Sequence, residues 1–196
     1  MLSAKLGHFL DKPLAPIARK IPLSPNVISV IGFVITLAAS VVLPFHIMAG
    51  GLLILLGGLF DILDGIVARI NEQRTKFGAF LDSTLDRYSD SCIFIALAWY
   101  FFRMQDQAGL ILTLGCLVGA LLISYVRARA EGLGISCHVG LMERPERVVL
   151  IAAGCMSGWI IPVLVILLVL SHLTVIHRIF HVFRETARRG GQGERM

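Results

Sequence analysis

The sequence is poor in charged and in aromatic residues. Asp, Glu, Lys and Arg make up 16% of its 196 residues and Phe, Trp and Tyr make up 8%, whereas 56% are hydrophobic. A water-soluble domain has about a quarter of its residues charged, and the mean hydropathy of +0.80 places this chain outside that class. We therefore predict an integral membrane protein. At roughly 20 apolar residues per span, there is room for five or six spans but not for a second large domain.

Cysteine is scarce as well. The four cysteines are widely separated and form no CxxC pair: Cys92, Cys116, Cys137 and Cys155. This spacing excludes a disulfide framework and a structural zinc site, so we expect free thiols. Residues 1–20 lack the apolar stretch and the cleavage site of a signal peptide, and we expect no segment to be removed. The net charge of +5 fits nucleic acid or an anionic membrane surface. The high hydropathy indicates that the partner is lipid and not nucleic acid.

Six apolar runs predict an all-α membrane domain over residues 23–185 with six transmembrane helices. They cover residues 26–43, 46–70, 79–102, 109–130, 148–158 and 159–182, and the fifth is short unless it begins at Arg144. Ser24 and Pro25 are typical of a helix start. Residues 1–22 predict an N-terminal amphipathic helix at the membrane interface, although packing on the protein's own loops fits the same pattern. We expect residues 186–196 to be a flexible basic tail.

The distribution of basic residues predicts the topology. They gather before the first run, in the loops 70–78 and 127–147, and after the last run, whereas the turns near 44–48 and 156–162 have none. Lys and Arg accumulate in cytoplasmic loops, so we place both termini in the cytoplasm. Arg103 is then a single basic residue on the outer side, which the rule tolerates.

Two neighbouring runs carry carboxylates at their cytoplasmic ends. Asp61 and Asp64 are three residues apart, and Asp82 and Asp86 are four apart, so we expect each pair to occupy one face of a helix. The connector 71–77 is short enough for an antiparallel hairpin that brings the two faces together. Four carboxylates at membrane depth mark a functional site, and divalent cations would relieve their repulsion. Oxygen ligands favour Mg²⁺ or Mn²⁺, which often share their coordination with phosphate groups.

Small residues lie close to these carboxylates. Gly57, Gly58, Gly65, Ala68 and Gly78 leave the backbone open to the approach of a ligand. For Gly57 and Gly58, tight packing between transmembrane helices is the alternative interpretation. Asp90 continues the acidic stripe of Asp82 and Asp86, and we interpret it as a structural hydrogen-bonding residue.

These residues resemble the signature of the CDP-alcohol phosphotransferase family, D-x2-D-G-x2-A-R-x8-G-x3-D-x3-D, at every fixed position from Asp61 to Asp86. The resemblance implies an enzyme that transfers a phosphatidyl-type group from a CDP-linked lipid such as CDP-diacylglycerol to an alcohol and releases CMP. It implies two metal ions held by Asp61, Asp64, Asp82 and Asp86, with Asp86 as the general base. Gly65, Ala68, Arg69 and Gly78 would bind the CDP-lipid. It also implies a homodimer in the cell membrane whose active site faces the cytoplasm.

The acceptor site is predicted on the arginines of the last three runs. The segments 124–131 and 143–147 resemble those of bacterial phosphatidylinositol phosphate synthases, in which a basic pocket takes inositol 1-phosphate. The resemblance proposes four ligands of the acceptor phosphate: Arg127, Arg144, Arg147 and Arg178. Ordinary positive charge on the cytoplasmic side is the alternative for these arginines. Glycerol 3-phosphate or serine as the acceptor, or a membrane transporter in place of an enzyme, stay open at this point.

Overall fold

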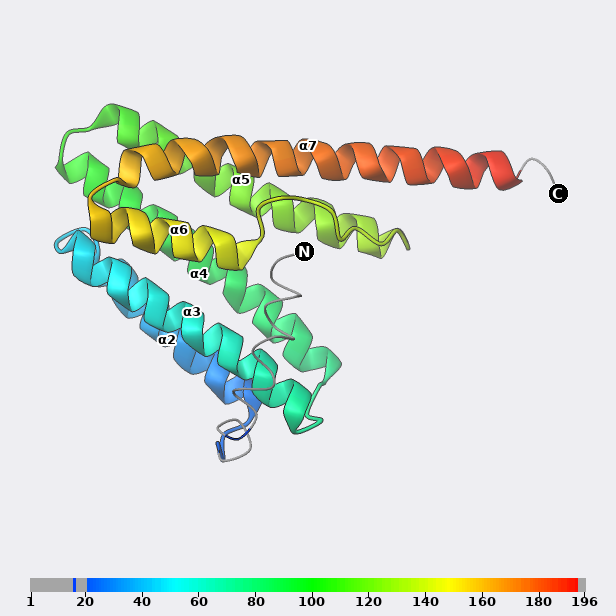
Figure 1. Ribbon diagram of the computed structural model, residues 1–196, viewed down its shortest axis with the longest axis horizontal. Coiled ribbons are helices and arrows are strands. Elements are labelled where there is room, and N and C mark those ends of the chain that lie inside the picture. The colour runs from blue at the N-terminus through cyan, green and yellow to red at the C-terminus, as the bar shows by residue number, and fades with distance from the viewer. Residues whose placement is uncertain (1–15, 17–20, 194–196) are drawn as a thin grey trace.

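The chain is all-helical in the computed structural model, which describes residue 16 and residues 21–193 (Figure 1). Within these residues there are six α-helices and no strands: α2 (Pro25–Val42), α3 (Ile47–Ile70), α4 (Lys76–Arg103), α5 (Gln107–Gly132), α6 (Arg144–Ser157) and α7 (Ile160–Gly193). They match the six predicted runs, and the fifth does begin at Arg144. Nearly all of the predicted amphipathic segment 1–22 lies outside the described residues, so that segment stays a prediction.

The helix ends follow from the local sequence. Pro25 occupies the first turn of α2, where its missing N–H costs no hydrogen bond. The Thr75 hydroxyl caps α4 by accepting a hydrogen bond from the Gly78 N–H at 2.9 Å, and Asp106 caps α5 in the same way. Helix α6 ends at Gly158, whose φ of +77° belongs to the left-handed region that glycine adopts readily.

Four helices are long and apolar enough to cross a membrane, namely α2, α3, α5 and the part of α7 from Ile160 to Arg188. The protein is therefore an integral membrane protein. The two other helices differ for identifiable reasons. Helix α4 carries a group of charged residues in its first half, and α6 has only 14 residues, or about 21 Å of helix.

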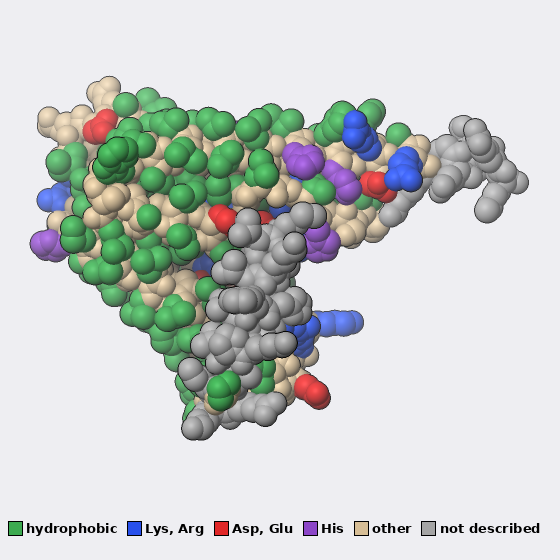
Figure 2. All heavy atoms as spheres, viewed as in Figure 1, with side chains coloured by type: hydrophobic (Ala, Val, Ile, Leu, Met, Phe, Trp, Pro, Cys, Tyr) green, Lys and Arg blue, Asp and Glu red, His purple; other side chains and the backbone are tan. Residues whose placement is uncertain are grey.

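The six helices pack as a closed ring. Following the contacts, α2 packs on α3, α3 on α6, α6 on α7, α7 on α5, α5 on α4, and α4 returns to α2. The core inside this ring is apolar and includes Leu43, Ile54, Phe94, Leu97 and Leu164, each almost fully buried. The outer surface is also hydrophobic over most of the face visible in Figure 2. An apolar exterior around an apolar core is what a lipid environment requires.

The connections divide between the two ends of the bundle. The turns between α2 and α3, α4 and α5, and α6 and α7 lie at one end, and the connectors α3–α4 and α5–α6 lie toward the other (Figure 1). At the first end, the Arg103 guanidinium donates a hydrogen bond to the Pro44 carbonyl at 2.7 Å and lies 4.6 Å from the centre of the Phe45 ring. This arrangement agrees with the predicted grouping of the loops.

Helix α7 is longer than its apolar run. It continues to Gly193 and crosses residue 185, where we expected the domain to end and a tail to begin. Nothing in the sequence from 183 to 189 breaks a helix, because Phe-Arg-Glu-Thr-Ala-Arg-Arg contains neither proline nor glycine. The flexibility of residues 186–196 stays a prediction.

Candidate active site

A cavity of about 430 Å³ opens inside the ring, and every described helix except α2 contributes to its wall. One part of the wall is acidic and comes from α3 and α4: Asp61, Asp82, Asp86 and Asp90. The facing part is basic and includes all four arginines predicted for the acceptor: Arg127, Arg144, Arg147 and Arg178. Apolar side chains such as Leu55, Leu59 and Val148 complete the lining. Residues from five helices, far apart in the sequence, thus meet in one place.

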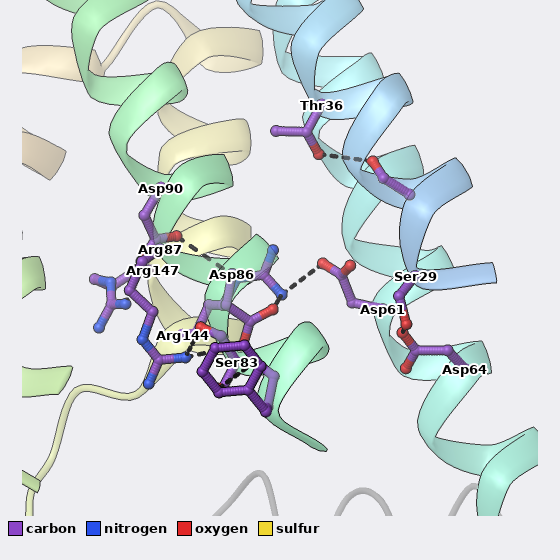
Figure 3. Close-up of polar contacts among 12 residues, drawn as sticks. Ser29, Thr36, Asp61, Asp64, Ser83, Asp86, Arg87, Asp90, Arg144 and Arg147 are labelled. Carbon is purple, nitrogen blue, oxygen red and sulfur yellow. Dashed lines mark hydrogen bonds and ion pairs between the residues drawn. The ribbon is translucent and has the colours of Figure 1, made fainter. Parts of the chain in front are cut away.

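Arg144 joins the two acidic helices. Its Nη1 atom lies 2.6 Å from Asp61 Oδ2 on α3 and 2.6 Å from Asp86 Oδ1 on α4 (Figure 3). Its Nε lies 3.7 Å from Asp90 Oδ1. Because Arg144 is the first residue of α6, this helix delivers a positive charge between carboxylates that would otherwise repel each other in a poorly solvated site.

Asp64 points in a different direction from Asp61. Its carboxylate accepts a hydrogen bond from the Ser29 hydroxyl on α2, and Figure 3 shows it turned toward α2, whereas Asp61 faces α4 and Arg144. Helix α3 lies between α2 and α6 in the ring, so two residues one turn apart reach different neighbours. Asp82 lines the cavity with Asp61 and Asp86. The predicted convergence therefore holds for three of the four aspartates, and Asp64 lies beside it.

The chemistry of these residues fits a hard divalent cation. Every candidate ligand is a carboxylate, and Asp61 Oδ2 is a buried oxygen whose ion pair with Arg144 lacks the alignment of a hydrogen bond. Within the described part of the chain, however, no three Asp, Glu, His or Cys side chains already form a metal cage. The Arg144 guanidinium lies between Asp61 and Asp86. The metal-ligand roles of the four aspartates stay predictions.

The glycines of the signature make close contacts. A Cβ atom on Gly65 would lie 3.2 Å from the guanidinium of Arg69, so that guanidinium lies over bare backbone in the last turns of α3, next to Ala68. A Cβ on Gly78 would lie 2.9 Å from Asn26 Oδ1. Gly78 thus lets the first turn of α4 approach the start of α2. Their contacts with the CDP-lipid stay a prediction.

Gly57 and Gly58 serve helix packing. A Cβ on Gly57 would collide with the Thr36 hydroxyl of α2, and one on Gly58 would lie 2.9 Å from Val148 of α6. The packing interpretation is therefore correct for Gly57, which does not line the cavity, while Gly58 both packs and lines it. The close approach of α2 and α3 places Ser29 within reach of Asp64.

The four arginines differ in how they are held. Arg127 pairs with Glu131 at 2.9 Å and lies 3.1 Å from His138 Nδ1, near the cavity's edge. Arg178 is 2% exposed and donates hydrogen bonds to the carbonyls of Ile123, at 2.6 Å, and Val139, at 2.8 Å. It therefore ties the α5–α6 connector to α5 and α7, a structural role that the sequence did not indicate.

Arg147 is the partner of Asp90. It is 2% exposed, and its Nη2 donates to the Asp90 carboxylate. This contact confirms the interpretation of Asp90 as a structural hydrogen-bonding residue. Sequence reasoning did not find Ser29 as the partner of Asp64, and the only available signal was a hydroxyl in an apolar helix. The four cysteines are free, as predicted.

A helical membrane protein with a cavity lined by aspartates and arginines is equipped to act on a charged, phosphate-bearing substrate at the lipid boundary. Residues 22–184 match the CDP-alcohol phosphatidyltransferase family model, and the chain belongs to this family. It is therefore a metal-dependent CDP-alcohol phosphotransferase, an enzyme of phospholipid biosynthesis. Family membership decides against the transporter alternative.

The chain is similar to inositol phosphate synthases within this family. The chain is 40% identical to the archaetidylinositol phosphate synthase of Methanothermobacter thermautotrophicus over 91% of each chain. It is 41% identical to the phosphatidylinositol phosphate synthase of Mycobacterium tuberculosis, over 71% of this chain and 67% of that one.

Solved structures agree. The crystal structure of the M. tuberculosis phosphatidylinositol phosphate synthase with CDP-DAG bound superposes with a TM-score of 0.79 at 35% identity, covering 86% of this chain and 92% of that one. The structure of the same enzyme in complex with manganese and citrate also gives a TM-score of 0.79, at 34% identity over 88% of each chain.

Proposed function

We propose that this enzyme transfers the phosphatidyl group of CDP-diacylglycerol to inositol 1-phosphate, forming phosphatidylinositol phosphate and releasing CMP. The proposal rests on one observation: aspartates of α3 and α4 and arginines of α5, α6 and α7 line the same cavity. The acidic wall suits a metal-bound diphosphate, and the basic wall suits a second, phosphorylated substrate. The relative crystallised with CDP-DAG supports this donor. Both named relatives are inositol phosphate synthases, which supports an inositol phosphate as the acceptor.

The donor side rests on the signature residues. Asp61, Asp64, Asp82 and Asp86 would hold two Mg²⁺ or Mn²⁺ ions, and Gly65, Ala68, Arg69 and Gly78 would contact the CDP-lipid. When bound, such ions neutralise the diphosphate and the charge on departing CMP. A relative crystallised with manganese supports a divalent ion. To bind an ion, Asp64 would either give up its hydrogen bond with Ser29 or bind the ion through its other oxygen.

Asp86 is proposed as the general base. It would take the proton from the acceptor hydroxyl while that oxygen forms a bond to the lipid-side phosphorus. The bond from this phosphorus to the bridging oxygen breaks, and CMP leaves with the electron pair. Asp86 belongs to the acidic wall and contacts Arg144 of the basic wall. This position lets it reach a hydroxyl held from the basic side.

The basic side is proposed to select the acceptor. Arg127, Arg144, Arg147 and Arg178 all line the cavity, and guanidinium groups bind phosphate oxygens in a planar, two-point fashion. Serine has no phosphate to use this wall. Glycerol 3-phosphate does, and it is the second candidate acceptor. The inositol phosphate synthases among the relatives favour inositol 1-phosphate.

The membrane arrangement is part of the proposal. We infer that α4 and α6 span the bilayer together with the four apolar helices, which gives six spans, and that residues 1–22 form an interfacial helix. The cavity end would face the cytoplasm of the cell membrane, because the basic loops 70–78 and 127–147 belong to that end. The proposed units are 1–22, 23–185 and 186–196, and we propose a homodimer.

An acceptor panel tests the function. Purified enzyme with Mg²⁺ or Mn²⁺ and CDP-diacylglycerol is offered inositol 1-phosphate, glycerol 3-phosphate, serine or free inositol, and CMP release is measured. We expect release with inositol 1-phosphate. Release with glycerol 3-phosphate alone would overturn the choice of acceptor while keeping the reaction. A parallel panel with an archaetidyl donor decides the lipid, since the relatives differ in that part of their names.

A further inference from the structure

Asp90 has no role in the transfer described above, yet it contacts two arginines at once. It lies one turn beyond Asp86 on α4, outside the family signature, and its side chain is 9% exposed. One carboxylate oxygen accepts a hydrogen bond from Arg147 Nη2, and the other lies 3.7 Å from Arg144 Nε. Both arginines belong to the first turn of α6. Asp90 therefore holds Arg147 directly and adds a longer contact to Arg144, whose closer partners are Asp61 and Asp86.

The arginines held by Asp90 have donors to spare. Arg147 Nε and Nη1 and Arg144 Nε are buried and have no hydrogen-bond partner. A buried donor without an acceptor destabilises the protein, and the effect is larger when the donor is charged. Both side chains line the cavity. An anion with several oxygens, such as a phosphomonoester, would satisfy these donors through charge-assisted hydrogen bonds.

The position of Asp90 relates this anion site to the reacting group. Asp86 and Asp90 are four residues apart on one helix, which is a rise of about 6 Å. The proposed base and the anchor of the two arginines are thus held at a fixed separation by α4. Without the Asp90 carboxylate, Arg147 would lose this ion pair, and Arg144 would keep its contacts with Asp61 and Asp86.

We propose that Asp90 is a positioning residue that aims Arg147 and Arg144 at the phosphate of the acceptor and so makes the enzyme prefer phosphorylated alcohols. This inference rests on the proposed function. It adds a residue outside the signature that acts on the acceptor through two arginines and touches neither the donor nor the acceptor itself.

The test compares Asp90→Asn and Asp90→Glu with the wild type, using full-length enzyme in detergent or liposomes. We expect Asp90→Asn to raise the KM for inositol 1-phosphate at least about tenfold, with kcat and the KM for CDP-diacylglycerol within about threefold. Asp90→Glu keeps the charge and should give an intermediate acceptor KM. Arg147→Gln should resemble Asp90→Asn, and the double variant should be no worse than either single one. Ser91→Ala, on the same helix, is the matched control.

Several outcomes separate the two proposals. If the wild type does not use inositol 1-phosphate, the acceptor assignment fails. If the wild type does use it and Asp90→Asn lowers kcat, raises the donor KM, or leaves the acceptor KM unchanged, the role of Asp90 is overturned. Should Asp90→Asn not fold, Asp90→Glu decides, and an acceptor KM equal to that of the wild type then overturns the inference.

Discussion

The Nη1 atom of Arg144 lies 2.6 Å from Asp61 Oδ2, one of the oxygens predicted to bind a metal ion. The same atom is equally close to Asp86. A divalent cation bound to these two oxygens would compete with the guanidinium for them. The protein therefore carries its own positive charge beside two predicted metal ligands, and we predict that Arg144 withdraws from them when the ions bind.

Replacing Arg144 tests this competition. We expect Arg144→Gln to bind Mn²⁺ about tenfold more tightly in the absence of substrates, because a competing positive charge is removed. In EDTA the variant should unfold at a lower temperature, since Asp61 and Asp86 lose their partner. Mn²⁺ titration monitored by electron paramagnetic resonance and thermal unfolding with and without the ion measure both effects.

Arg127→Gln is the control for the Arg144 experiment, because Arg127 pairs with Glu131 and His138 and not with the aspartates. Its Mn²⁺ affinity should match the wild type. Weaker or unchanged Mn²⁺ binding by Arg144→Gln would show that the ions bind elsewhere or that Arg144 does not compete with them.

Asp86→Asn should abolish transfer while the protein still folds. The amide occupies the same space but cannot accept the hydroxyl proton, and loss of a general base costs about 10²–10⁴-fold in rate. CMP release from CDP-diacylglycerol measures the rate, and thermal unfolding in detergent reports the fold. Turnover close to that of the wild type would remove Asp86 from the role of base.

Asp64→Asn should abolish metal-dependent binding of the donor. Asp64 is a predicted metal ligand and also accepts a hydrogen bond from Ser29 of α2. The Ser29→Ala variant removes the hydrogen bond and leaves the carboxylate free to bind the metal. The alanine variant removes one hydrogen bond, and we expect a loss of stability of about 1 kcal/mol with donor binding retained. Binding of CDP-diacylglycerol with and without Mg²⁺ measures the difference. Normal binding by Asp64→Asn would exclude it as a ligand.

Arg178→Gln should lower stability as well as acceptor affinity. The guanidinium satisfies two backbone carbonyls while it is almost completely buried. Its loss removes both hydrogen bonds, at a cost of about 1–3 kcal/mol. Thermal unfolding of the variant without substrates isolates this effect from binding. An unchanged melting temperature would mean that the α5–α6 connector does not depend on Arg178.

Much of the fold could be predicted from the sequence, because the positions of membrane helices depend on local composition. The six apolar runs, the turn after Val42 and the start of α6 at Arg144 depend on residues within a few positions of one another. The extent of α7 could not be inferred from hydropathy, because its last turns are polar and remain helical without an apolar run.

The site was predictable in its composition but not in its pairings. The spacings from Asp61 to Asp64 and from Asp82 to Asp86 indicated two acidic faces. All of these aspartates except Asp64 line one cavity. Which arginine enters between them depends on the packing of α6 against α3, and no local pattern encodes that contact. The same holds for Ser29 with Asp64, 35 residues apart. Contacts that depend on how the six helices pack cannot be predicted from the spacing of residues along the sequence.

The length of α7 has a practical consequence. Its 34 residues extend about 51 Å at 1.5 Å per residue, whereas the hydrocarbon layer is about 30 Å thick. An upright α7 therefore extends roughly 20 Å beyond the hydrocarbon layer. A fluorophore placed at Glu185 would be attached to a helix and not to a loop. Quenching by lipid-borne probes of known depth would measure its distance from the membrane centre.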